Sequence, residues 1–274
     1  MRVGLIGYGN IARTLMGLLR KDLPAPFASL TVLTLPELAE PTRAYLNTES
    51  DGVAVETKVC EAFDDFVASP LDLVVECAGH GAVLEFVPPL LERGIDTIIV
   101  SIGVLADQDL ETRLRAAADI GGGQIILPAG AIGGIDILAA LRSAGLSSVT
   151  YSGRKPPAAW AGTPAENILD LKSVSEPVTF FKGNAREAAR QYPKNANVAA
   201  TLALAGLGFE QTQVELIADP DAAGNLHEYS VESPVARYRM QIENMPSASN
   251  AKTSVTTVYS VLRAVMNRQK RVVI

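Results

Sequence analysis

The sequence is poor in the residues that mark metal, redox and secreted proteins. Its 274 residues include two cysteines and two histidines. Cys60 and Cys77 lack the spacing of a metal or redox motif, and a secreted fold usually carries more cysteine. We therefore predict no metal site, two reduced thiols and a cytoplasmic location.

Runs of basic residues and long apolar stretches are also missing. Thirty acidic residues against 24 basic ones give a net charge of -6, which disfavours nucleic acid as a partner. The most apolar segment, residues 125–141, is interrupted by Pro128 and Asp136, so no membrane span is predicted. The first residues form an apolar strand pattern with no signal peptide, so we expect the chain to stay where it is made.

The composition, 48% hydrophobic and 20% charged, is that of a globular protein. Over residues 2–127, short runs of Val, Ile and Leu alternate with helical patterns, which is typical of a parallel sheet. The predicted strands are 2–6, 30–34, 53–56, 71–76, 97–101 and 124–127. The fold class is thus α/β, with a Rossmann dinucleotide-binding domain over residues 1–130.

The pattern changes to α+β after Pro128. Residues 131–253 predict a second domain for substrate and dimerisation, with strands at 148–154, 178–182, 213–218, 226–232 and 236–243. We expect a mostly antiparallel sheet whose last three strands form a meander. The C-terminal helix, 254–268, can pack back onto the first domain. An apolar sheet face left uncovered by helices would pair in a homodimer.

A glycine-rich turn follows the first predicted strand. Residues 7–12, GYGNIA, match G-x-G-x-x-A, in which Gly7 permits a tight bend and Gly9 lets the backbone approach a pyrophosphate. Asn10 and Ile11 begin a helix whose free N–H groups favour phosphate, and Ala12 allows close packing. We predict cofactor contacts at these positions; the alternative is a turn that serves geometry only.

Two strand ends bear on the cofactor. Cys77 and Ala78 follow the fourth predicted strand, at the end of the sheet where α/β proteins bind ligands. We predict that both residues contact the cofactor. The second strand ends in Leu35-Pro36, without the acidic residue that binds the ribose of NAD. The choice between NAD and NADP therefore stays open, and we expect use of both.

Four polar positions carry alternatives. His80 either touches the cofactor or lies in solvent, and His227 on a predicted strand is by itself an ordinary structural histidine. Asn195 or Asn197 either caps a helix or reaches the nicotinamide ribose or the substrate.

A polar segment precedes the last helix. Lys252, Thr253 and Ser254 lie at its end, where a helix start adds a positive dipole, and they can bind a small anionic ligand.

Several short segments, in their order and spacing, resemble the L-aspartate dehydrogenase family along almost the whole chain. They are 4–12, 76–81, 101–107, 128–134, 153–157, 192–198, 218–220, 225–227 and 252–254. The resemblance implies that His227 is the active-site histidine and that Ala131 and Asn197 contact the dinucleotide.

The family reaction is the NAD(P)-dependent oxidative deamination of L-aspartate to iminoaspartate, then oxaloacetate and ammonia, and its reverse. The chemistry needs one group that titrates near neutrality, for which His227 is the natural choice. The two substrate carboxylates need cations or N–H groups, which we assign to Lys252, Thr253 and Ser254.

Other functions fit parts of the pattern. One is another two-domain dehydrogenase or reductase, acting on homoserine, a dihydrodipicolinate-like imine or a sugar. Another is a regulatory protein that binds dinucleotide without turnover, and a third is a structural interaction protein. Whether the product feeds NAD biosynthesis, and in which direction the enzyme works, stays open.

Overall fold

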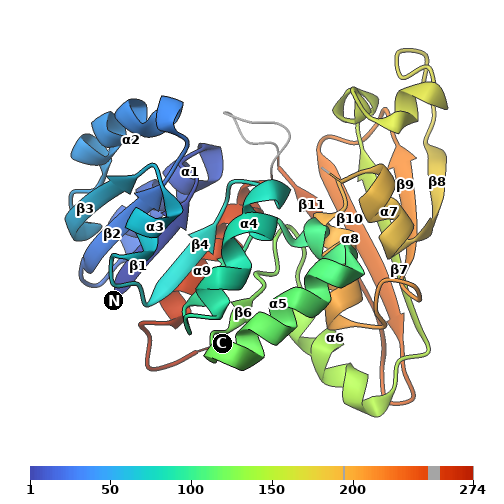
Figure 1. Cartoon of the computed structure of the whole chain (residues 1–274). Helices are drawn as coiled ribbons and strands as arrows, with labels where there is room; N and C mark the ends of the chain where they lie inside the picture. Colours follow the sequence, from blue (N-terminus) through green and yellow to red (C-terminus); the bar gives the residue numbers. More distant parts are fainter. Residues whose placement is uncertain (194, 246–253, 274) are drawn as a thin grey trace. The chain divides into compact units, whose positions relative to one another are not determined.

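The structure is a computed structural model that describes residues 1–193, 195–245 and 254–273. The chain divides into two compact units (Figure 1). Unit 1 comprises residues 1–101, 107–128 and 258–274, and unit 2 comprises residues 102–106 and 129–257.

Unit 1 contains a parallel sheet in the order β3-β2-β1-β4-β5-β6. Its strands are β1 (Arg2–Ile6), β2 (Phe27–Leu33), β3 (Ala54–Cys60), β4 (Leu73–Glu76), β5 (Asp96–Ile99) and β6 (Ile125–Ile126). Its helices are α1 (Asn10–Asp22), α2 (Pro36–Glu49), α3 (Phe63–Val67), α4 (His80–Leu91), α5 (Gln108–Gly121) and most of α9 (Val255–Asn267). This order confirms the predicted Rossmann-type fold.

Side chains alternate between the two faces of β1. Val3 and Leu5 join a buried core with residues of α1 and α9, whereas Ile6 packs in a second core with residues of α3 and α4. Gly4 stands between Val3 and Leu5 in the strand, and a Cβ at Gly4 would lie 2.6 Å from the ring of Phe66 on α3. Helices therefore cover both faces of the sheet, and Gly4 allows α3 to approach closely.

The third strand is longer than the sequence predicted. It runs to Cys60 rather than Glu56, and Val55, Glu56 and Lys58 are exposed along it. β3 is at the edge of the sheet, where charged side chains are common, so its sequence lacks the apolar pattern of the inner strands.

Unit 2 contains a mixed sheet in the order β11-β10-β7-β9-β8, in which only β7 and β9 pair parallel. Its strands are β7 (Ser148–Lys155), β8 (Val178–Asn184), β9 (Gln213–Ala218), β10 (Asn225–Glu232) and β11 (Arg237–Asn244). Its helices are α6 (Ile135–Leu141), α7 (Ala185–Gln191) and α8 (Asn197–Ala205), with four short 3-10 helices, η1 (Ile102–Ala106), η2 (Arg142–Ala144), η3 (Pro157–Trp160) and η4 (Pro164–Asn167).

The predicted meander of the last three strands is wrong. β10 and β11 form a hairpin, but β7 lies between β9 and β10. The loop after β9 is held on the end of β7, because the Asp219 N–H donates to the Lys155 carbonyl at 2.9 Å and Arg154 pairs with the Asp219 carboxylate. The loop thus crosses the end of β7 instead of making a tight turn.

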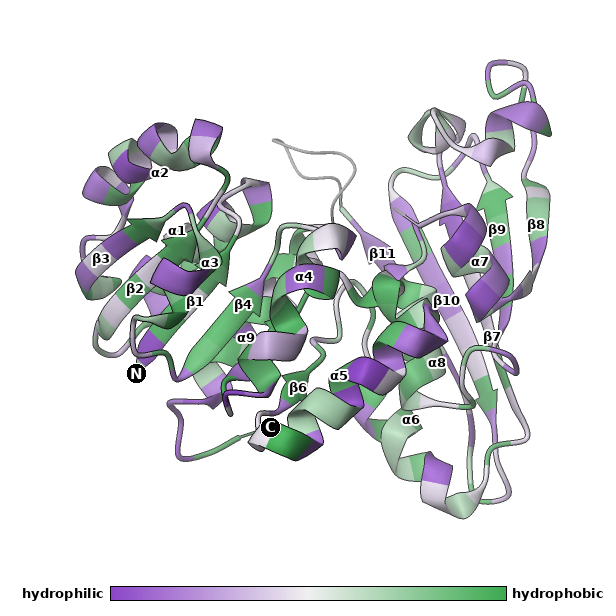
Figure 2. Cartoon of the chain, in the orientation of Figure 1, coloured by the Kyte–Doolittle hydropathy of each residue, from purple (hydrophilic) through white to green (hydrophobic). Residues whose placement is uncertain are grey.

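Two helices lie between β8 and β9. α7 was not predicted; it begins in a capping box between Asn184 and Glu187. α8 is apolar along most of its length (Figure 2), and residues 198–203 are all buried. A helix that is apolar all round is typical of a protein core, and α8 packs on α6, α7 and β7.

A buried carboxylate fixes the end of β4. Glu76 is fully buried and accepts hydrogen bonds from the backbone N–H groups of Ala78, Gly79 and Ser101 and from the Ser101 hydroxyl, at 2.8 to 3.1 Å. Because one carboxylate satisfies four donors, it sets the path of the chain after β4 and after β5.

We expect Glu76→Gln to lower the free energy of unfolding by about 1–3 kcal/mol, because the amide cannot accept from all of these donors. Urea unfolding measures the loss. Glu56→Gln, on exposed β3, is the matched control and should change the value by less than about 0.5 kcal/mol. Equal stability of the two variants would contradict this account of Glu76.

Candidate active site

The turn between β1 and α1 has the geometry of a phosphate site. Gly7 has φ +84° and its N–H donates to the Leu33 carbonyl at 2.8 Å; a Cβ there would lie 2.8 Å from the Cβ of Ala78. A Cβ at Gly9 would meet nothing within 4 Å, and no described side chain caps α1. Only glycine fits at position 7, and the start of α1 is left without a side-chain cap among the described residues.

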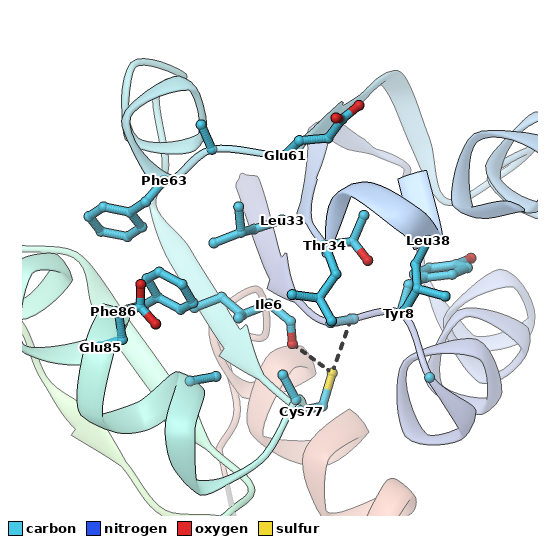
Figure 3. Close-up of a pocket in the computed structure, with 16 residues that line it drawn as sticks. Ile6, Tyr8, Leu33, Thr34, Leu38, Glu61, Phe63, Cys77, Glu85 and Phe86 are labelled. Atoms are coloured by element: carbon cyan, nitrogen blue, oxygen red, sulfur yellow. Dashed lines mark hydrogen bonds between the residues drawn. The ribbon is translucent and has the colours of Figure 1, made fainter. Parts of the chain in front are cut away.

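A cavity of about 700 Å³ lies at the carboxyl ends of the strands of unit 1 (Figure 3). Its walls come from the ends of β1, β2 and β4, from the segment that leads into α3, and from α2 and α4. The residues are Ile6 to Gly9, Leu33 to Leu35, Leu38, Glu61 to Phe63, Cys77, Ala78, Ala82, Glu85 and Phe86. The walls are mostly apolar, as in the binding sites of flat aromatic rings.

Four of the predicted cofactor residues line this cavity: Gly7, Gly9, Cys77 and Ala78. The Cys77 thiol donates to the Ile6 and Gly7 carbonyls, at 3.4 and 3.5 Å, and burial raises its pKa. Cys77 is thus a neutral thiol in the wall, which suits contact rather than chemistry.

The rest of the glycine motif forms the first turn of α1. Asn10 and Ile11 begin the helix, and Ala12 is fully buried in the core of unit 1. The residues present fit a dinucleotide: an open helix start for the pyrophosphate beside a cavity for the adenosine.

The second strand ends at this cavity without a free acid. Thr34 and Leu35 line the wall, and Leu35 is 59% exposed. Glu61 also lines it, and its carboxylate accepts from Arg43 at 2.8 Å. His80, the first residue of α4, is half-buried and lies outside the described lining.

Unit 2 holds a buried pair of aromatic side chains. His227 on β10 lies directly opposite Gly153 on β7, and the Tyr151 hydroxyl meets His227 Nδ1 at 2.8 Å. A Cβ at Gly153 would lie 2.6 Å from that hydroxyl. The missing side chain at position 153 therefore gives Tyr151 the space to reach the histidine.

The surroundings keep this pair uncharged. Burial, with the charge of Lys155, lowers the pKa of His227 to about 3. Burial also raises the pKa of Tyr151. His227 is thus neutral near pH 7 in the structure, whereas the sequence analysis expected it to titrate there.

Lys155 is the last residue of β7 and is 8% exposed. Its Nζ donates to Asn195 Oδ1 at 2.6 Å and lies 5.0 Å from the centre of the Trp160 ring. Burial lowers the pKa of Lys155 to about 8. The sequence analysis assigned no role to Lys155 or Tyr151. The signal that could have found Lys155 is a basic residue at the end of a strand in which every second residue is buried.

The prediction that Asn195 or Asn197 caps a helix is wrong, because the N-cap residue of α8 is Ala196. Asn195 accepts from Lys155, and Asn197 Oδ1 accepts from the Gly103 N–H at 2.8 Å. Ala131 is buried, and its carbonyl accepts from Asn244 Nδ2 at 3.1 Å.

The predicted substrate residues are partly outside the described chain. Lys252 and Thr253 lie there, whereas Ser254 is described, buried, and accepts from Asn225 Nδ2 at 3.3 Å. The described residues contain no group of three or more His, Cys, Asp or Glu that could hold a metal ion. No described helix has the length and apolar character needed to cross a membrane.

Comparisons with known proteins distinguish the two halves of the chain. Residues 136–268 match the family described as aspartate dehydrogenase, C-terminal, and residues 7–128 match the NAD-binding domain of homoserine dehydrogenase. An L-aspartate dehydrogenase of Cupriavidus necator is 45% identical over 98% of this chain and 97% of its own length. That of Pseudomonas aeruginosa is 52% identical over 72% of this chain and 73% of its own.

A solved structure agrees with these relatives. The aspartate dehydrogenase of Thermotoga maritima has a TM-score of 0.75 and 28% identity, and the match covers 100% of this chain and 99% of that one. The identity to the curated relatives spans both units, and the resemblance noted in the sequence is confirmed. This chain belongs to the aspartate dehydrogenase family.

Proposed function

We propose that this protein is an NAD(P)-dependent L-aspartate dehydrogenase. It would oxidise L-aspartate to iminoaspartate, which water converts to oxaloacetate and ammonia, and catalyse the reverse reductive amination. The observation that carries the proposal is that the buried His227–Tyr151 pair and Lys155 lie in the part of the chain matched by the aspartate dehydrogenase C-terminal family. The glycine turn is shared with many other dehydrogenases.

The cofactor would supply the hydride acceptor. The helix start at Gly9, Asn10 and Ile11 would hold its pyrophosphate, and the cavity beside the turn would hold its adenosine. Ala131 and Asn197 remain the proposed further contacts, by resemblance. Glu61 is paired with Arg43, and position 35 is leucine rather than an acidic residue. The cavity wall would therefore tolerate a 2′-phosphate, and we propose use of both NAD and NADP.

His227 would act as a neutral hydrogen-bonding group. In a neutral imidazole one nitrogen accepts and the other donates. If Tyr151 donates to Nδ1, Nε2 keeps the proton and can donate to the substrate or to the water that adds to the imine. This role needs orientation, which the Tyr151 hydrogen bond supplies, and needs no charge on the ring.

The first test measures the increase in absorbance of the reduced nicotinamide after L-aspartate is mixed with the protein and either NAD or NADP. Reduction that requires L-aspartate is expected. Homoserine and sugar substrates in its place test the other two-domain dehydrogenases. A protein that binds dinucleotide without any turnover would be a regulatory module, contrary to the proposal.

We predict that kcat/KM with NAD and with NADP differs by less than about two orders of magnitude, or ~2.7 kcal/mol. Leu35→Asp should raise the NAD to NADP ratio at least about tenfold, because a carboxylate binds the ribose 2′-OH and repels a 2′-phosphate. Ile120→Asp, at an exposed position of α5, is the control. An unchanged ratio in Leu35→Asp would place the ribose elsewhere.

His227→Ala should reduce the rate about 10²- to 10⁴-fold while dinucleotide affinity stays near that of the unmodified chain. His227→Asn, which hydrogen-bonds but cannot titrate in this range, should keep more activity than His227→Ala. His80→Ala is the matched control, with a loss below about tenfold. Steady-state rates in both directions and a cofactor titration measure these effects; near-normal turnover in His227→Ala would remove the assignment.

We also propose a homodimer through unit 2. The sequence suggested an apolar sheet face, but alternate residues of β10 and β11 on the side opposite His227, such as Glu228 and Arg239, are polar and ion-paired. Charged residues are depleted at the centre of protein interfaces and common at their rim, so this ion-paired face would form the rim of the dimer interface. Sedimentation at micromolar concentration should give twice the chain mass of 29.0 kDa, and a 29.0 kDa species would refute the dimer.

A further inference from the structure

Lys155 is a buried amine without a carboxylate partner among the described residues. Within the described part of the chain its Nζ has one hydrogen-bond acceptor, the Asn195 side-chain oxygen, and it lies 5.0 Å from the centre of the Trp160 ring. A protonated amine has three N–H donors and is costly to bury unless they are satisfied. This environment therefore favours the neutral amine, which is a base.

The titratable groups around Lys155 come from three elements. His227 on β10 and Tyr151 on β7 are neutral near pH 7, for the reasons given above. Asp219, in the loop after β9, directs its carboxylate to Arg154 and to the Asp221 N–H. Because burial is not offset by a negative partner, the pKa of Lys155 falls to about 8, and burial with the charge of Lys155 lowers that of His227 to about 3.

An amino-acid oxidation needs such a base. The α-amino group of the substrate carries a proton near pH 7, and a hydride leaves the α-carbon readily only when the nitrogen lone pair is free. His227, neutral at pH 7 with its pKa near 3, is a weak proton acceptor. Lys155 lies on the same face of the sheet as His227, because Tyr151, Gly153 and Lys155 alternate along β7 and Gly153 pairs with His227.

We propose that Lys155 is the group that takes the proton from the substrate α-ammonium before hydride transfer, a role that rests on the proposed function. The lone pair of Nζ accepts one proton, the substrate N–H bond breaks, and a neutral amine and a lysine ammonium result. This step moves no electrons between substrate and cofactor. Lys155 returns the proton to solvent before the next turnover, and in reductive amination it donates it.

A different role for Lys155 makes the opposite prediction. A lysine that binds a substrate carboxylate must be charged, so substrate affinity would fall as the pH rises past its pKa. A base must be neutral, so kcat/KM for aspartate oxidation, which reports the pKa of the free protein, would rise through about pH 8. Arginine at position 155 separates the roles, because it keeps the charge and cannot act as a base.

The first experiment needs no turnover. Trp160 is the only tryptophan in the sequence, and its ring lies 5.0 Å from Nζ. Its fluorescence should therefore titrate with a midpoint near pH 8 in the cofactor-free protein, and the transition should be absent from Lys155→Met. Lys182→Gln, at an exposed lysine on β8, is the control and should keep the transition. A transition that persists in Lys155→Met, or is missing from the unmodified chain, overturns the inference.

The second experiment measures kcat and KM for L-aspartate against pH. Lys155→Arg and Lys155→Met should both lose about 10²- to 10⁴-fold in kcat, and their kcat/KM should no longer change near pH 8. Their dinucleotide affinity and melting temperature should stay near those of Lys182→Gln. Near-normal kcat in Lys155→Arg, with a raised KM only in Lys155→Met, would show carboxylate binding and overturn the base. If the unmodified chain does not oxidise L-aspartate, the proposed function fails and takes this role with it, whatever the fluorescence shows.

Discussion

The register between β7 and β10 is the constraint on which the second unit depends. It sets Gly153 opposite His227, so that Tyr151, two residues earlier, reaches the imidazole over the missing side chain. It also directs Lys155, two residues later, to the same face. A shift by one residue would turn Tyr151 and Lys155 to the other face and separate them from the histidine. The chemistry of the site is thus fixed by backbone pairing before any side-chain contact is considered.

The Rossmann unit could be predicted from the sequence because its signals are local. The glycine turn stands directly after an apolar strand, and a repeating pattern of strand and helix follows it. What failed in unit 1 was β3, whose exposed edge carries polar residues. In unit 2 the neighbours of β9 depend on how the Asp219 loop is held on the end of β7, which is a contact between residues 155 and 219. No local pattern encodes a contact over that separation, and so the meander was wrong.

The candidate site was likewise only partly predictable, because its contacts join residues far apart in sequence. His227 was predicted by resemblance, and its hydrogen-bond partner Tyr151 was not, because the two residues lie on different strands, 76 positions apart in sequence. The electrostatics were also beyond the sequence: a histidine in water titrates near neutrality, but burial moves the pKa of His227 to about 3 and that of Lys155 to about 8. Burial, rather than the type of side chain, therefore makes Lys155 and not His227 the residue with a pKa close to neutrality.

These two buried bases depend on each other. A proton on Lys155 disfavours a proton on His227, since the charge of one lowers the pKa of the other. As the pH falls, Lys155 is therefore protonated before His227. An aspartate substrate brings two carboxylates, whose negative charge would raise the pKa of Lys155 and make it a stronger proton acceptor when the substrate is present. With a pKa of about 8 in the free protein, Lys155 becomes a neutral base as the pH rises past that value, and the bound substrate carboxylates would shift this change to higher pH.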